Sequence, residues 1–337
     1  MVRKIVGLFQ YILFFGLGFF LVWWSLQKID EKGWKDIEQA FASTRYFYIL
    51  PACLALLASH YSRALRWKML IKPLGYTPKT SNTYIAVLIG YLANLALPRL
   101  GEILKCTMLA RYEKVAPEKL IGTIVAERAI DLICLIMIIA IAFFTQMDII
   151  GSYLIDTIQQ NWGGNVKRDY SILLIAIAVF VILILFTSYL LRKYSHLSFM
   201  KKFSVILQGV WHGLTSIRMV KKKGVFLLHS VFIWAMYLVS IQMGMYSLEA
   251  TEQFGIIPSL SVLATGSMAM IITPSGIGAY PIFIQETMSL YGVRDTIGIA
   301  FGWLMWTVQF FQVLIAGFTA MSLLPFLNKK NTYAHPQ

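Results

Sequence analysis

The feature that most constrains this sequence is a short apolar run that ends at Pro98, Arg99 and Glu102. The run 83–97 has the composition of a helix, and at about 1.5 Å per residue it covers about 22 Å, less than the ~30 Å hydrocarbon core of a bilayer. Pro98 removes a backbone donor, and Gly101 permits a further turn. A broken helix with charges at membrane depth needs surrounding protein or a water-filled cavity. The sequence therefore predicts a functional site at this break.

The composition is that of a polytopic membrane protein. The chain has 337 residues, of which 58% are hydrophobic and 14% charged, and its mean hydropathy is +0.67. The net charge of +14 lies in segments between apolar runs, which favours lipid headgroups over nucleic acid as the anionic partner. The first apolar run is too long for a signal peptide, so we expect it to remain as a membrane helix. The three scattered cysteines indicate no disulfide and no metal site, and we expect no cofactor.

Eight apolar segments follow one another along the chain. Six of them are long enough to span a bilayer, namely 5–26, 46–66, 120–145, 171–191, 225–248 and 297–325. The other two, 83–112 and 257–292, are interrupted by proline and glycine. We expect these two segments to form broken hairpins.

The distribution of lysine and arginine predicts the orientation in the membrane. Segments 63–79 and 192–224 carry several cations and no acid, so we expect them in the cytoplasm. Segments 27–45, expected to be a loop, and 249–256 carry acidic residues and should lie outside. Both termini are then cytoplasmic, in a multi-pass protein of the cytoplasmic (inner) membrane.

This orientation makes 83–112 a hairpin that enters from the cytoplasm and 257–292 a hairpin that enters from outside. The order span, span, hairpin, span then occurs twice with opposite orientation, in 1–145 and 171–325. Inverted repeats with broken helices are a recurrent transporter plan, and the site lies where the breaks meet. We therefore expect one all-α membrane domain over 1–337, with six full spans and two re-entrant broken-helix hairpins. The alternative is that one interrupted segment is an ordinary span.

The cytoplasmic segment 192–224 has its own pattern. Apolar residues recur at three- and four-residue steps between clusters of lysine. This predicts an amphipathic helix in the cytoplasmic interface, acting as a brace between the two halves or as a contact with anionic lipid.

Three groups of charged residues fall near the cytoplasmic end of the predicted membrane region: Arg63 and Arg66; Arg99, Glu102 and Lys105; and Glu127, Arg128 and Asp131. Cations outnumber carboxylates, so a cavity lined by these groups favours a phosphate, with arginine as its bidentate partner. Two alternatives stay open. Arg66 with Trp67 is also typical of an interfacial anchor, and Arg99 can form a structural ion pair with Glu127 or Asp131.

The second break, 273–281, carries no charge. Gly276 and Gly278 leave backbone amides exposed before a short predicted helix, 282–291, and such a helix start can hold an anion. The simpler reading is that the glycines let the hairpin turn tightly. The sequence contains no nucleophile motif, zinc-ligand spacing or phosphate-binding loop, and we expect no enzymatic activity.

Over nearly the whole chain, these residues resemble the membrane region of lysylphosphatidylglycerol synthase/flippases, multi-pass proteins often described as flippase-like. The resemblance rests on four motifs: Arg63-Ala-Leu-Arg66-Trp67, Asn94 with Pro98-Arg99-Leu-Gly101-Glu102, Glu127-Arg128 with Asp131, and Pro274-Ser-Gly276-Ile-Gly278. It implies movement of a charged or glycosylated lipid between leaflets, with the first two motifs at the headgroup.

Two positions depart from the family pattern. Ser275 stands where the family often has glycine, and Pro281 stands where many members have glutamate. If that glutamate handles substrate, Glu286 has to replace it here or the substrate differs. We expect no soluble aminoacyl-transferase domain of the kind that the synthases carry, so the resemblance does not imply synthesis.

The sequence therefore predicts a flippase-like transporter that moves a phospholipid or a polyprenyl-phosphate-linked lipid across the cytoplasmic membrane. One alternative is a membrane-embedded lipid or glycosyl transferase with Glu127 or Asp131 as base. The other is an accessory subunit of a lipid-modifying enzyme or a glycosyltransferase.

Overall fold

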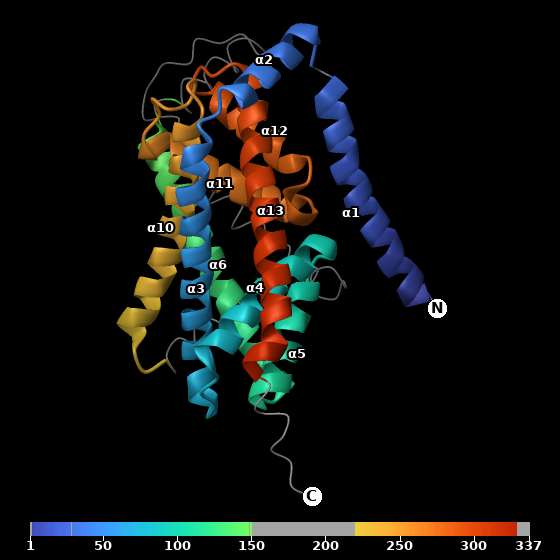
Figure 1. The fold of residues 1–337 in the computed structure, drawn as a ribbon, viewed down its shortest axis with the longest axis vertical. Helices are drawn as coiled ribbons and strands as arrows, with labels where there is room; N and C mark the ends of the chain where they lie inside the picture. The colour runs from blue at the N-terminus through green and yellow to red at the C-terminus, as the bar shows by residue number, and fades with distance from the viewer. Residues whose placement is uncertain (1, 28, 148, 150–219, 329–337) are drawn as a thin grey trace, which may run out of the picture.

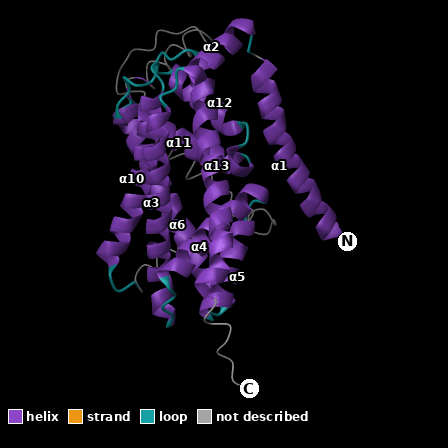
Figure 2. Cartoon of the chain, in the orientation of Figure 1, coloured by secondary structure: helices purple, strands orange, loops and turns teal. Residues whose placement is uncertain are grey.

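The computed structural model describes residues 2–27, 29–147, 149 and 220–328, and in the first helix it describes side chains from Phe15 onward. All regular structure in this part of the chain is helical (Figure 2). The predicted span 171–191 and nearly all of the predicted interfacial helix 192–224 lie outside the described residues.

Ten α-helices make up the described part: α1 Val2–Gln27, α2 Glu31–Ala42, α3 Ile49–Ile71, α4 Thr80–Ala96, α5 Leu100–Glu113, α6 Pro117–Thr145, α10 Lys223–Ser247, α11 Ile256–Ile272, α12 Ala279–Ser289 and α13 Asp295–Asn328. Three short 3₁₀ turns accompany them, at Tyr46–Tyr48, Lys72–Leu74 and Pro274–Gly276.

Helices α3, α10 and α13 run along the long axis of the molecule (Figure 1). The pair α4–α5 lies toward one end, and the pair α11–α12 lies toward the other. Helix α13 packs against both pairs, through α4 and α12, and α3 packs against α10 and α4. One apolar core surrounds Phe301 among α10 to α13, and another surrounds Trp67 among α3 to α6.

The first interrupted segment is broken where the sequence predicts. Helix α4 ends at Ala96, Leu97 is extended, and Arg99 has a positive φ of 69° before α5 begins. The backbone N–H of Gly101 donates to Asn94 Oδ1 at 2.8 Å. A Cβ on Gly101 would overlap the carbonyl oxygen of Gly90, so the close approach of α5 to α4 requires glycine. Segment 83–112 is therefore two helices.

The second interrupted segment is also two helices. Between α11 and α12, Ser275, Gly276 and Gly278 all have positive φ, at 54°, 73° and 73°. Helix α12 begins at Ala279, three residues earlier than predicted. A Cβ on Gly278 would lie 2.5 Å from the carbonyl oxygen of Gly18, so this glycine also lets α1 approach the break.

The prediction of a loop over 27–45 is wrong, because this segment contains α2. Asp30 caps the helix by accepting a hydrogen bond from the Gly33 N–H at 2.7 Å. Ile37 and Ala40 on one face are buried, and α2 packs against α13. The charged and apolar residues of this segment follow the pattern of an amphipathic helix.

Two helices of the described part, α10 and α13, are long and apolar enough to cross a membrane. A third candidate arises if α2 and the segment 46–74, which meet at a 65° bend, form one span. The number of spans and the inverted repeat stay predictions, although α6 covers the predicted span 120–145 and α3 covers all but the first three residues of 46–66.

Candidate functional site

A buried cluster of charges joins α3, α5 and α6. Arg63 Nη1 donates to Glu127 Oε1 at 3.1 Å and also to Asp131. Arg66 Nη2 donates to Asp131 Oδ1 at 2.5 Å, and Lys105 Nζ donates to Glu127 Oε2 at 2.6 Å. Glu127 is 1% exposed and Arg66 fully buried. These contacts place two carboxylates among three cations.

Neighbouring polar groups extend this cluster. Arg63 Nη2 donates to the Tyr237 hydroxyl at 3.2 Å, and Arg66 Nη1 donates to Ser230 Oγ at 3.1 Å. Trp67 is also fully buried, and its indole N–H donates to Thr123 Oγ1 at 2.8 Å. The alternative of an interfacial anchor at Arg66 and Trp67 is therefore wrong, since both side chains point into the helix bundle.

A second ion pair lies at the edge of the cluster. Arg128 Nη2 donates to Glu102 Oε1 at 2.6 Å, and the Arg128 side chain is half exposed. Arg128 does not pair with Asp131, which the spacing along α6 would also permit, because the arginines of α3 occupy both oxygens of that carboxylate. Glu102 therefore links the first break to α6.

The two helix breaks meet at one cavity of about 810 Å³. From the first break it is lined by Asn94, Pro98 and Arg99, and from the second by Thr273, Pro274 and Ser275. The hydroxyl of Ser275 donates to the backbone carbonyl oxygen of Asn94 at 3.2 Å. The predicted meeting of Pro98 and Pro274 at one cavity is therefore confirmed. We call this space the central cavity.

The central cavity adjoins a smaller cavity of about 380 Å³. Tyr91, Arg128 and Gln309 line both, and the smaller one also contacts Arg63 and Asp131. The buried charge cluster and the two breaks thus line neighbouring cavities that share part of their walls.

The charged residues that line the central cavity are both arginines. Among the described residues, no carboxylate lines this cavity and none pairs with Arg99. The predicted alternative of an ion pair between Arg99 and Glu127 or Asp131 is therefore wrong. Thr273 Oγ1 is buried without a hydrogen-bond partner in the described part of the chain. The cavity wall can supply two guanidinium groups and a hydroxyl to an anion.

Several predicted site residues lie away from the central cavity. Arg66 and Lys105 belong only to the buried cluster. The Gly276 amide donates to the Thr273 carbonyl oxygen at 3.0 Å, and neither Gly276 nor Gly278 lines the cavity, so anion binding by these amides stays a prediction. Glu286 is exposed on α12 and lines neither cavity.

Pro281, where the resemblance implies glutamate in many family members, is packed against a helix. Pro281 contacts α13 so closely that a Cβ on Gly302 would lie 2.6 Å from the Pro281 Cα atom. Glu286 also lies away from both cavities, and its role in place of the family glutamate stays a prediction.

The sequence did not single out Tyr91, Trp306 or Gln309, which also line the central cavity. The sequence did contain a sign that Gln309 lines a cavity, since it is a polar amide within the apolar segment 297–325. Trp306 Nε1 donates to the carbonyl oxygen of Ser275 at 2.9 Å and so supports the second break. Within the described ranges, no three His, Cys, Asp or Glu side chains are grouped to hold a metal ion.

Comparison with known proteins is consistent with this membrane architecture. The family model described as Lysylphosphatidylglycerol synthase TM region matches residues 11–317. The chain is 23% identical over 313 residues to the UPF0104 membrane protein MJ1595 of Methanocaldococcus jannaschii, covering 87% of this chain and 89% of that protein. No solved structure matches the chain.

Proposed function

The chain belongs to the family of the Lysylphosphatidylglycerol synthase TM region, a family of membrane proteins, and from this premise we propose that it is a flippase-like transporter of an anionic lipid. The observation that carries the proposal is the central cavity, where two helix breaks meet beside Arg99 and Arg128. Broken helices that line a polar cavity inside a membrane protein are typical of a substrate site.

The charges of the central cavity support an anionic headgroup. Arg99 has no carboxylate partner in the described part of the chain, and an unpaired guanidinium at bilayer depth is costly. A phosphate would satisfy it through two parallel hydrogen bonds. Arg128 would contribute a second positive charge, while its contact with Glu102 holds it at the cavity wall.

The topology is part of the same proposal. We place α4–α5 as a re-entrant hairpin from the cytoplasm and α11–α12 as one from outside, within an inverted repeat of the inner membrane with both termini in the cytoplasm. Their positions toward opposite ends of the molecule support this arrangement (Figure 1).

We further propose that the protein moves its lipid without chemical conversion. A transferase would need a carboxylate free to accept a proton. Glu127 is held by Arg63 and Lys105, and Asp131 is held by Arg63 and Arg66. Carboxylates fixed in such ion pairs are poor general bases.

Transport is tested with the purified full chain in liposomes. The probes are fluorescent phosphatidylglycerol, which is anionic, and fluorescent phosphatidylcholine, which is zwitterionic, together with a labelled polyprenyl phosphate. A quencher added outside the liposomes reaches only the probe in the outer leaflet. The measured quantity is therefore the rate at which probe moves from the inner to the outer leaflet and loses its fluorescence. We expect faster movement of an anionic probe than in protein-free liposomes, and at least a tenfold loss in Arg99→Ala.

The matched variants separate charge from geometry. Arg99→Lys keeps the charge but loses the bidentate contact, so its rate should fall between those of wild type and Arg99→Ala. Lys114→Gln changes an exposed cation that lines neither cavity and should keep the wild-type rate. If the wild-type protein moves none of the three probes, the transport proposal fails in favour of an accessory role. If Arg99→Ala keeps the wild-type rate, the headgroup role of Arg99 is wrong.

A further inference from the structure

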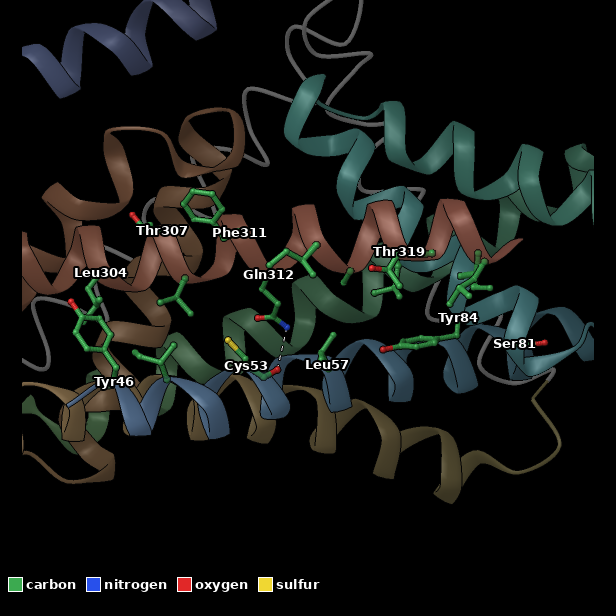
Figure 3. Close-up of a pocket in the computed structure, with 18 of the residues that line it drawn as sticks. Tyr46, Cys53, Leu57, Ser81, Tyr84, Leu304, Thr307, Phe311, Gln312 and Thr319 are labelled. Carbon is green, nitrogen blue, oxygen red and sulfur yellow. Dashed lines mark hydrogen bonds between the residues drawn. The ribbon is translucent and has the colours of Figure 1, made fainter. Parts of the chain in front are cut away.

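An apolar groove of about 990 Å³ lies between α3, α4 and α13 (Figure 3). It lies on the other side of α13 from the central cavity. Thr307, Phe311 and Ile315 of α13 face the groove, whereas Trp306 and Phe310 face the central cavity. The groove is therefore a separate space, which the proposed transport site does not use.

The groove is long enough to cross the hydrocarbon core of a bilayer. Its lining runs along α13 from Leu304 to Leu327, which at 1.5 Å per residue is about 35 Å. The hydrocarbon core of a bilayer is ~30 Å thick, so an acyl chain of one leaflet would fill only about half of this length. A single occupant of the entire groove has to carry a longer chain.

The walls suit hydrocarbon. Leu57, Leu88 and Leu323 are typical of the lining, and Phe311 and Ile315 stand exposed along its rim. Near the middle, Gln312 Nε2 donates to the backbone carbonyl oxygen of Cys53 at 3.1 Å, which ties α13 to α3 at the floor (Figure 3). One amide donor of Gln312 is thus used by the protein, while its Oε1 is buried without a hydrogen-bond partner in the described part of the chain.

The two ends of the groove differ in charge. Ser81 and Leu327 mark one end, beside a segment that carries Lys68, Lys72 and Lys79. Lys68 Nζ donates to Thr80 Oγ1 at 2.6 Å, directly before Ser81, and Lys72 and Lys79 are exposed.

One carboxylate stands beside this end and offsets part of the positive charge of the three lysines. Glu113, on neighbouring α5, accepts a hydrogen bond from Asn82 at 2.5 Å. At the opposite end, Tyr46 lines the groove, and the adjacent Arg45 pairs with Glu252. An amphiphile in the groove would therefore place an anionic group at the lysine end.

We propose that this groove binds the hydrocarbon chain of a polyprenyl phosphate, with the phosphate beside Lys72 and Lys79. The length of the groove calls for a chain longer than one leaflet, and the charge at its end matches a phosphate. This lipid site is independent of the central cavity and of transport.

The test is native mass spectrometry of the full chain released from detergent, with undecaprenyl phosphate as probe. Farnesyl phosphate has the same headgroup on a short chain, and undecaprenol has the same chain without charge. We expect one tightly bound undecaprenyl phosphate, at least tenfold tighter than farnesyl phosphate. Thr319→Trp fills the groove at an exposed position and should weaken binding at least tenfold. Met321→Trp, on the same helix outside the groove, should bind as wild type does.

Charge variants test the position of the phosphate. The double variant Lys72→Gln, Lys79→Gln should bind undecaprenyl phosphate more weakly and bind undecaprenol as wild type does. Lys114→Gln should change the binding of neither lipid. Equal binding of the short and long phosphates, or equal binding by Thr319→Trp and Met321→Trp, would overturn the proposal. So would a dimer that Thr319→Trp alone disrupts, because the groove would then hold a second copy of the chain. Arg99→Ala should not change the binding of undecaprenyl phosphate in the groove. A failure of the groove proposal can therefore be told apart from a failure of the transport proposal.

Discussion

The hydroxyl of Ser275 donates a hydrogen bond to the backbone carbonyl oxygen of Asn94, and this contact joins the second helix break to the first. Ser275 is held from the other side as well, since its own carbonyl oxygen accepts from Trp306 Nε1. Its φ of 54° is unfavourable for a residue with a Cβ. The contact between the two breaks therefore depends on a residue in a strained conformation.

Substitution of Ser275 separates the strain from the hydrogen bond. Ser275→Ala keeps the strain and loses the bond, so it should lower the free energy of unfolding by about 1 kcal/mol. Ser275→Gly loses the same bond but relieves the strain, and it should be more stable than Ser275→Ala by about 0.5–1 kcal/mol. Thermal unfolding of the three proteins in one detergent measures both differences. A glycine variant no more stable than the alanine variant would show that the strain is negligible.

The positions of the two breaks could be predicted because their causes are local. Pro98 and Pro274 each follow an apolar run too short to cross a bilayer, and glycines follow within a few residues. Neither signal depends on distant parts of the chain. The meeting of the breaks was then predicted from the expected entry of the two hairpins from opposite sides of the membrane.

The partners of the charged residues could not be predicted in the same way. Arg63 is 64 residues from Glu127 and 68 from Asp131 along the chain, and nothing local distinguishes a buried arginine from an interfacial one. The pairing depends on how α3 packs against α6, which only the folded structure gives. By contrast, α2 was missed although its signal was local, in Asp30 before a helical pattern.

The buried cluster should be far more sensitive to charge loss than the exposed pair. Glu127→Gln leaves Lys105 and Arg63 buried without this carboxylate and should destabilise the protein by about 3–5 kcal/mol. Glu102→Gln breaks the half-exposed contact with Arg128 and should cost less than about 1 kcal/mol. Denaturant titration followed by tryptophan fluorescence gives both values. Equal losses in the two variants would mean that the cluster is solvated.

The close crossing of α4 and α5 predicts a large effect of a single methyl group. Gly101→Ala places a Cβ against the Gly90 carbonyl oxygen and the Asn94 side chain, so the two helices must separate. We expect a loss of about 1–3 kcal/mol in stability. Gly122→Ala is the matched control on α6, where nothing lies within 4 Å of an added Cβ. It should be neutral or slightly stabilising, and a Gly101→Ala protein as stable as this control would contradict the tight crossing.

The orientation of the molecule in the membrane gives the last prediction. Helix α3 has 23 residues and at 1.5 Å per residue is about 35 Å long, enough to cross the ~30 Å hydrocarbon core. Near the start of α3, Arg45 pairs with Glu252. Beyond its end, Lys119 Nζ lies over the Tyr76 ring, 5.2 Å from the ring centroid.

Sites near Glu252 and near Lys119 should therefore lie on opposite sides of the membrane. The lysine-rich end is the cytoplasmic one by the charge bias. In a variant whose three native cysteines are alanine, a cysteine at Glu252 should react with an impermeant maleimide added to intact cells. A cysteine at Lys114, beside the start of α6, should react only after the membrane is opened. Labelling of both from one side would contradict the hairpin arrangement, because α3 would then fail to cross. If the cysteine at Lys114 reacts in intact cells and the cysteine at Glu252 only after the membrane is opened, the protein has the opposite orientation in the membrane. The hairpin arrangement would then still hold.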